Sequence, residues 1–138
     1  MRELKFRAWG KRVKIMGKPF NFEILIETVL KDTLGTTIDM SYFDEMELMQ
    51  YTGLKDKNDK EIYEGDLLVE NEYDKEAYAI YEIFFHDGDE ANHHIGFQMN
   101  RVHYKGRLCG GYIPNFLPKT TKRMEVIGNI YENKDLIV

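Results

Sequence analysis

Hydrophobic and polar residues alternate along several short segments of the chain, as in β-strands, whose successive side chains point to opposite faces. Residues 4–9 alternate in this way, and residues 13–16 are expected to return beside them after a turn. Residues 77–85 are apolar on both faces, which predicts the longest strand and a central place in its sheet. Further short strands are predicted over residues 48–51, 61–63, 67–70, 95–102 and 124–130.

Turn-forming residues separate these strands. Gly53 can adopt a positive φ, which predicts a turn over residues 52–54, and the polar residues 57–60 predict a second, tight turn. Pro114 and Pro118 should confine the segment before the last strand to loop or edge positions, because proline cannot donate a backbone hydrogen bond.

Two segments near the N-terminus give less regular patterns. Residues 20–30 fit a strand, because alternate positions from Phe22 are apolar, and they also fit a helix face through Leu25 and Val29. A strand leading into irregular structure is the preferred interpretation. A helix of one or two turns is predicted to begin at Ser41, whose side chain can accept a hydrogen bond from an otherwise unsatisfied backbone amide.

Composition agrees with a mostly β fold that contains a minor helical part. Aromatic residues make up 13% of the 138 residues, and they favour strands. Residues 20–30, the longest apolar-leaning run, fall short of the roughly 20 residues that a membrane span needs, and no signal-type apolar stretch follows Met1. The single cysteine, Cys109, cannot form an internal disulfide. We therefore expect a cytoplasmic protein without a membrane partner.

The net charge of -5 conceals a strong segmentation along the chain. Residues 1–18 carry +6, residues 19–100 carry -15, residues 101–124 carry +6 and residues 125–138 carry -2. Such a pattern concerns solubility and partners more than it concerns the fold.

Three segments together resemble the YopX family of phage and prophage proteins. They are Met1–Trp9, the stretch from Leu48 to Val69, and Val126–Asn133, so the resemblance extends from one end of the chain to the other. The sequence departs from the family pattern at Asp59, where glycine is more frequent, and at Lys134, where proline is frequent. Both positions are expected in exposed turns.

This resemblance implies a fold and an origin. It implies an SH3-like small β-barrel over residues 56–138, preceded by an N-terminal extension of strands and a short helix over residues 1–55, with both packed as one compact unit. It also implies a phage or prophage accessory protein in a bacterial host. It assigns no catalytic residues and no cofactor.

A candidate metal site lies in the loop over residues 86–94, which crowds three imidazoles and three carboxylates into nine residues. His86, Asp89, His93 and His94 are residue types that bind zinc, manganese or iron, and they would suit a metal-dependent hydrolase. The spacing matches no helical metal motif, however, so a solvated hairpin loop is the preferred interpretation.

A candidate nucleic-acid surface follows in the basic and aromatic segment 101–123. Basic side chains can neutralise phosphates and exposed aromatic rings can stack on unpaired bases. The candidate residues are Arg101, His103, Tyr104, Lys105, Arg107, Lys119, Lys122 and Arg123. The alternative is a solvated face whose charges are paired internally with the acids of residues 19–100, and this is the preferred interpretation.

Other residues offer no stronger chemistry. Cys109 could act as a nucleophile with His103, but nothing in the sequence places the two together, so a packing role is preferred. We therefore expect a non-enzymatic binding module that contacts another protein or, as a homo-oligomer, a second copy of itself. Single-stranded nucleic-acid binding through residues 101–123 is the alternative, followed by a metal-dependent hydrolase.

Overall fold

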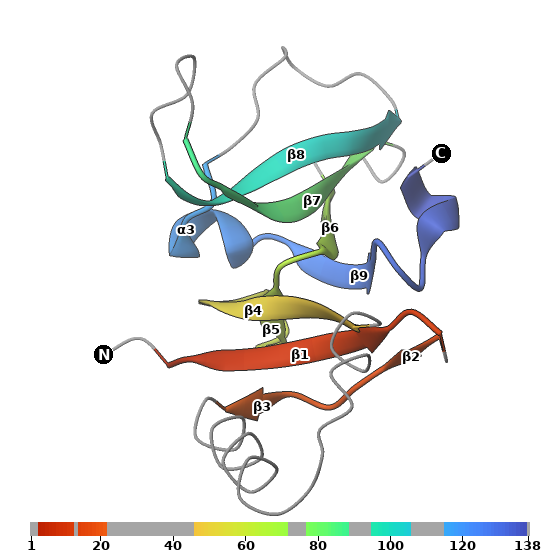
Figure 1. Ribbon diagram of the computed structural model, residues 1–138. Helices are drawn as coiled ribbons and strands as arrows, with labels where there is room; N and C mark the ends of the chain where they lie inside the picture. Colours follow the sequence, from red (N-terminus) through yellow and green to blue (C-terminus); the bar gives the residue numbers. More distant parts are fainter. Residues whose placement is uncertain are drawn as a thin grey trace, which may run out of the picture. The chain divides into compact units, whose positions relative to one another are not determined.

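The protein is mostly β (Figure 1). The computed structural model describes residues 3–12, 14–21, 46–71, 77–88, 95–105 and 115–137, apart from the side chain of Asn71. The helix predicted at Ser41 and most of the ambiguous segment 20–30 lie outside these residues. No helix in the described ranges is both long and apolar enough to cross a membrane.

By its internal contacts the chain divides into two units, which we call the first unit, Met1–Tyr51, and the second unit, Thr52–Val138. The division at residues 55 and 56 that the family resemblance implies falls four residues further along the chain. Strand β4, Met46–Lys55, contributes residues to both units.

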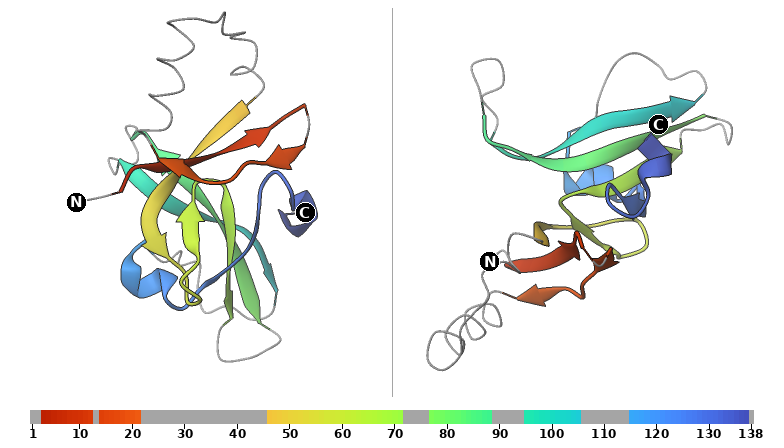
Figure 2. Two further views of the ribbon diagram at one scale, coloured as in Figure 1. Left: turned by 90° about the horizontal axis from the view of Figure 1, so that it is seen from below. Right: turned by 45° about the vertical axis from the view of Figure 1, so that its right-hand side comes forward.

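The first unit is an antiparallel sheet around β1, with β2 and β3 on one side of it and β4 on the other (Figure 2). The strands are β1, Lys5–Gly10; β2, Ile15–Met16; and β3, Phe20–Asn21; with the start of β4. Trp9 pairs with Met16, so the return predicted after the first strand is confirmed. One face of the sheet buries Trp9, Met49 and Tyr51.

The second unit contains a four-stranded antiparallel sheet in the order β8-β7-β6-β9. Its elements are β5, Glu61–Tyr63; β6, Asp66–Asn71; β7, Tyr78–His86; β8, Gly96–Lys105; α3, Pro118–Thr121; β9, Glu125–Asn129; and the 3-10 helix η1, Lys134–Ile137. Strand β7 lies between two partners, as its two apolar faces predict. Pro118 begins the short helix α3, where a loop or strand edge was predicted, and Pro114 lies outside the described residues.

The core of the second unit is shared by every one of its strands. Buried side chains from β5 to β9 and from the residue before β9 form one cluster: Ile62, Leu68, Ala79, Tyr81, Ile83, Met99, Met124 and Val126. Leu54, Phe97 and Phe116 pack against this cluster and are partly buried. Burial of this apolar surface is the main stabilising contribution to the unit.

The turn predicted over residues 52–54 is wrong, because β4 continues through them to Lys55. Gly53 does have a positive φ, of 84°, but it adopts this conformation within the strand. The hydroxyl of Thr52 donates a hydrogen bond of 2.8 Å to the carbonyl of Ile62 in β5, which holds the two strands together at this point. A glycine in such a conformation bends a strand without ending it.

The turn predicted over residues 57–60 is confirmed, and a buried carboxylate organises it. The backbone amides of Asn58 and Lys60 donate to Oδ1 of Asp56 at 2.8 and 2.9 Å. The amide of Val126, at the start of β9, donates to Oδ2 at 2.9 Å. Asp59 adopts a φ of 61°, a conformation in which glycine is unstrained. Asp56 therefore joins the turn between β4 and β5 to the last strand.

A second set of side-chain hydrogen bonds shapes the entry to β6 and the exit from β9. The Asp66 carboxylate accepts a hydrogen bond of 2.8 Å from the backbone amide of Tyr63. The side-chain oxygen of Asn129 accepts hydrogen bonds from the backbone amides of Tyr131 and Glu132. Asn133 lies so close to Gly128 that a Cβ there would collide with its side chain. The polar residues of these turns thus satisfy backbone geometry.

We predict that Asp56→Asn lowers the free energy of unfolding by about 2 to 4 kcal/mol. Three backbone amides donate hydrogen bonds to the Asp56 carboxylate. Asparagine would present its NH₂ group to one of these donors, and it carries no charge to strengthen the remaining hydrogen bonds. Denaturant unfolding at neutral pH measures the change. Asp59→Gly in the same turn is the matched control and should stay within about 1 kcal/mol of the wild type. Equal stability of Asp56→Asn and wild type would contradict this role of Asp56.

Candidate functional site

An exposed apolar surface lies on one face of the first unit's sheet. Gly10 of β1 is opposite both Ile15 and Met46, and Ala8 is opposite Leu48, so these residues share one face. The exposed fractions are 63% for Ile15, 49% for Leu48 and 39% for Met46. We call this surface the apolar face.

The apolar face continues toward the start of β1. Phe6 pairs with Phe20 of β3, and their ring centroids lie 6.1 Å apart. Phe6 and Ala8 are two residues apart in one strand, so both point to the same face as Leu48. Seven residues from four strands therefore form the apolar face: Phe6, Ala8, Gly10, Ile15, Phe20, Met46 and Leu48.

Basic residues lie along the β2 side of the apolar face. The described residues of the first unit carry six Lys or Arg side chains against Glu3 and Glu47, whereas residues 1–51 as a whole carry eight basic and eight acidic side chains. Lys11, Lys14 and Lys18 are exposed in the turn between β1 and β2 and just after β2. Lys11 forms an ion pair of 2.7 Å with Glu47. The sheet thus presents an apolar face with exposed lysines along one side.

The sequence contains a signal for this surface that the strand predictions did not use. Residues 46–51 are apolar on both faces, since Met46 and Leu48 alternate with Met49 and Tyr51. One of these faces is buried, which leaves the other exposed. Alternation alone cannot indicate which face of a two-sided strand is covered.

The candidate nucleic-acid residues are divided among three places. Arg101, His103, Tyr104 and Lys105 lie in β8; Lys119 lies in α3; Lys122 and Arg123 follow α3; and Arg107 lies outside the described residues. Within β8, the guanidinium carbon of Arg101 lies 5.3 Å from the ring centroid of Tyr104. The ring of His103 lies 5.8 Å from that of Tyr78 in the neighbouring strand.

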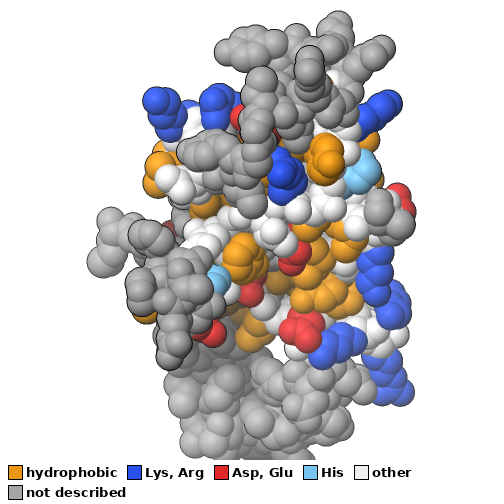
Figure 3. Space-filling model, turned by 90° about the horizontal axis from the view of Figure 1, so that it is seen from above, with side chains coloured by type: hydrophobic (Ala, Val, Ile, Leu, Met, Phe, Trp, Pro, Cys, Tyr) orange, Lys and Arg blue, Asp and Glu red, His pale blue; other side chains and the backbone are white. Residues whose placement is uncertain are grey.

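Part of the basic segment is paired with acids from the preceding stretch. Arg123 forms an ion pair of 3.4 Å with Glu70 in β6. Arg101 contacts Tyr104 and has no ion pair within the described part of the chain. Among the described residues, internal pairing thus accounts for Arg123 and not for Arg101. Hydrophobic side chains gather at the centre of the side seen from above β8, with Lys and Arg toward its margins (Figure 3).

The candidate metal residues are only partly described. His86 ends β7, and its Nδ1 accepts a hydrogen bond of 2.8 Å from the backbone amide of Gly88. Asp89, His93 and His94 lie outside the described residues. Among the residues that the structure describes, no three His, Cys, Asp or Glu side chains are grouped to hold a metal ion. The metal site stays a prediction.

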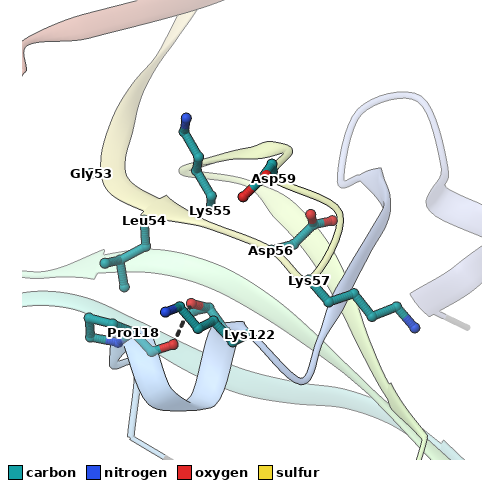
Figure 4. Close-up of a pocket in the computed structure, with 9 residues that line it drawn as sticks. Gly53, Leu54, Lys55, Asp56, Lys57, Asp59, Pro118 and Lys122 are labelled. Carbon is teal, nitrogen blue, oxygen red and sulfur yellow. Dashed lines mark hydrogen bonds between the residues drawn. The ribbon is translucent and has the colours of Figure 1, made fainter.

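A pocket of about 420 Å³ lies between the end of β4, the following turn and α3 (Figure 4). It is lined by Gly53, Leu54, Lys55, Asp56, Lys57, Asp59, Pro118, Thr121 and Lys122. The side chain of Leu54 points toward α3, whereas the amino groups of Lys55 and Lys57 point in different directions. Lys57 also pairs with Glu125 at 3.4 Å. The lysines do not converge on one point in the pocket.

One carboxyl group in the second sheet has a shifted protonation equilibrium. Glu82 in β7 is opposite Leu67, which is fully buried, and opposite Asn100. Burial raises the pKa of Glu82 because it disfavours the ionised form. Glu82 lies beside apolar residues, and a shifted carboxyl group alone does not define an active site.

The fold and these surfaces define a mostly β protein with an exposed apolar sheet face. The chain belongs to the YopX protein family, whose model matches residues 5–138. It is similar to the crystal structure of protein EF1440 from Enterococcus faecalis, with a TM-score of 0.58 and 21% sequence identity over 100% of both chains. That likeness supports the fold alone. No curated protein matches the chain.

We predict that Glu82→Gln makes the protein more stable than wild type at neutral pH. The folded state holds the Glu82 proton more tightly than the unfolded state does, so the free energy of unfolding decreases as pH rises through the range where Glu82 ionises. Glutamine removes this loss, and the advantage should vanish at pH values where a glutamate is protonated. Urea unfolding over a pH series measures both effects. Asp87→Asn, at an exposed position just beyond β7, is the control and should show no such advantage.

Proposed function

We propose that the protein is a non-enzymatic binding module that buries its apolar face against another protein. The single observation that carries this proposal is the contiguous exposure of Ile15, Met46 and Leu48 on paired strands. Soluble proteins rarely leave large apolar side chains side by side on a sheet unless another surface covers them.

The chemistry around the apolar face favours an acidic partner. The exposed lysines beside β2, which are Lys11, Lys14 and Lys18, attract an acidic surface and speed its association. A two-fold dimer through this face would instead bring the same lysines from both copies, because both copies present the same patch. We therefore favour a different protein, with an apolar patch bordered by Asp and Glu, over a second copy of this chain.

The proposal includes a finer description of the fold and the setting. The second unit is proposed to be an SH3-like barrel, which its short antiparallel strands and shared core support. A phage or prophage accessory role in the cytoplasm of a bacterial host is proposed from the family. The single cysteine, Cys109, is compatible with a reducing compartment.

We predict that Leu48→Lys abolishes capture of the partner by immobilised protein. A lysine at this position places a charge in the middle of an interface that must exclude water. The measurement is mass spectrometry of proteins retained from host extract, followed by binding assays with the purified candidate. The wild type should retain one predominant protein with an acidic surface, and the retention should weaken as salt concentration rises.

Leu117→Lys is the matched control, because Leu117 is 51% exposed and belongs to the second unit, not to the residues of the apolar face. This variant should retain the partner as the wild type does. Light scattering of the purified protein should show a monomer. Identical capture by wild type and Leu48→Lys would refute the apolar face as the binding surface, and a dimer that depends on Leu48 would refute a different protein as its occupant.

A further inference from the structure

Strand β8 contains an extra residue that reorients its basic and aromatic end. His103 pairs with Ile80 and Arg101 pairs with Tyr81, so Val102 has no partner of its own in β7. Residues three apart in a regular strand, such as 101 and 104, point to opposite faces. The bulge at Val102 adds one position and brings Arg101 and Tyr104 to the same face.

The contact between these two side chains agrees with this geometry. The Arg101 guanidinium lies over the Tyr104 ring at 5.3 Å, although Tyr104 is still 60% exposed. A cation over an aromatic ring holds both groups in a defined orientation. An ordered, exposed ring with an adjacent guanidinium is an arrangement that stacks on a base and neutralises a phosphate.

The sheet register adds a second cation to this face. Tyr104 is opposite Ala79, Ala79 is opposite Glu70, and Glu70 binds Arg123 at 3.4 Å. Directly opposite residues share a face, so Glu70 and its partner Arg123 lie on the same side of the sheet as Tyr104, about two strand spacings, roughly 10 Å, away and across the buried Ala79. Two guanidinium groups, Arg101 and Arg123, thus accompany one carboxylate.

We propose that the exposed end of β8, at the border of the buried core, binds single-stranded nucleic acid, with a base stacked on Tyr104 and phosphates bound by Arg101 and Arg123. This function is additional to protein binding by the apolar face and uses no residue of it. Stacking on Tyr104 contributes affinity that does not depend on which base is bound, since every base has a flat aromatic face. The two arginines supply the part of the affinity that depends on salt.

Fluorescence anisotropy of a labelled oligothymidylate of about 15 nucleotides, in about 50 mM salt, tests the proposal. Tyr104→Ala should weaken binding by about 5- to 100-fold, and Tyr104→Phe should restore most of it because the ring is kept. Arg101→Ala should weaken binding and reduce the slope of log affinity against log salt by about one. Glu70→Gln should tighten binding, because it removes the one carboxylate paired with Arg123.

Lys60→Ala, at an exposed position in the turn between β4 and β5, is the charge-matched control and should bind as the wild type does. Far-ultraviolet circular dichroism and denaturant unfolding of each variant check that its fold is kept. The proposal is overturned if the wild type shows no saturable binding, which would leave Tyr104 as a surface for protein contacts. It is also overturned if Tyr104→Ala binds as tightly as the wild type.

Discussion

The fold of the second unit depends on one buried carboxylate. Asp56 accepts three backbone hydrogen bonds, two from the turn that follows β4 and one from Val126, which is 70 residues further along the chain. A buried charge is costly unless it is fully hydrogen-bonded, so these donors must be in place for the unit to be stable. This single group sets the path of the β4–β5 turn and the position where β9 begins. The adjoining strands β5 and β9, which both contribute to the shared core, are positioned by the same contacts.

The alternation of apolar and polar side chains predicted most of the strands, because it arises where a strand buries one of its two faces. It identified β1 with its return β2, and it identified β7 as a central strand. It failed at Gly53, where a positive φ bends the strand and pairing with β5 continues. The partner of Asp56 at Val126 is distant in sequence, so no local pattern could reveal it. The resemblance to the YopX family, by contrast, is confirmed over residues 5–138.

The candidate surfaces were harder to predict than the strands, for two physical reasons. The apolar face depends on which side of a two-sided strand is covered, and only packing decides this. The pairing of Arg101 with Tyr104 depends on the bulge at Val102, which arises from the register between β7 and β8. The sequence did place both residues in a basic and aromatic segment. It could not show that they share a face.

The proposal that the apolar face is the site of protein contact is tested most directly by amide hydrogen exchange with and without the captured partner. Partner binding should slow exchange in β1 and in the first half of β4, where the backbone lies beneath Ala8, Gly10 and Leu48. Exchange in β8 should stay unchanged. Slowed exchange in β8 with none in β1 or β4 would contradict the proposal and place the partner on the other surface.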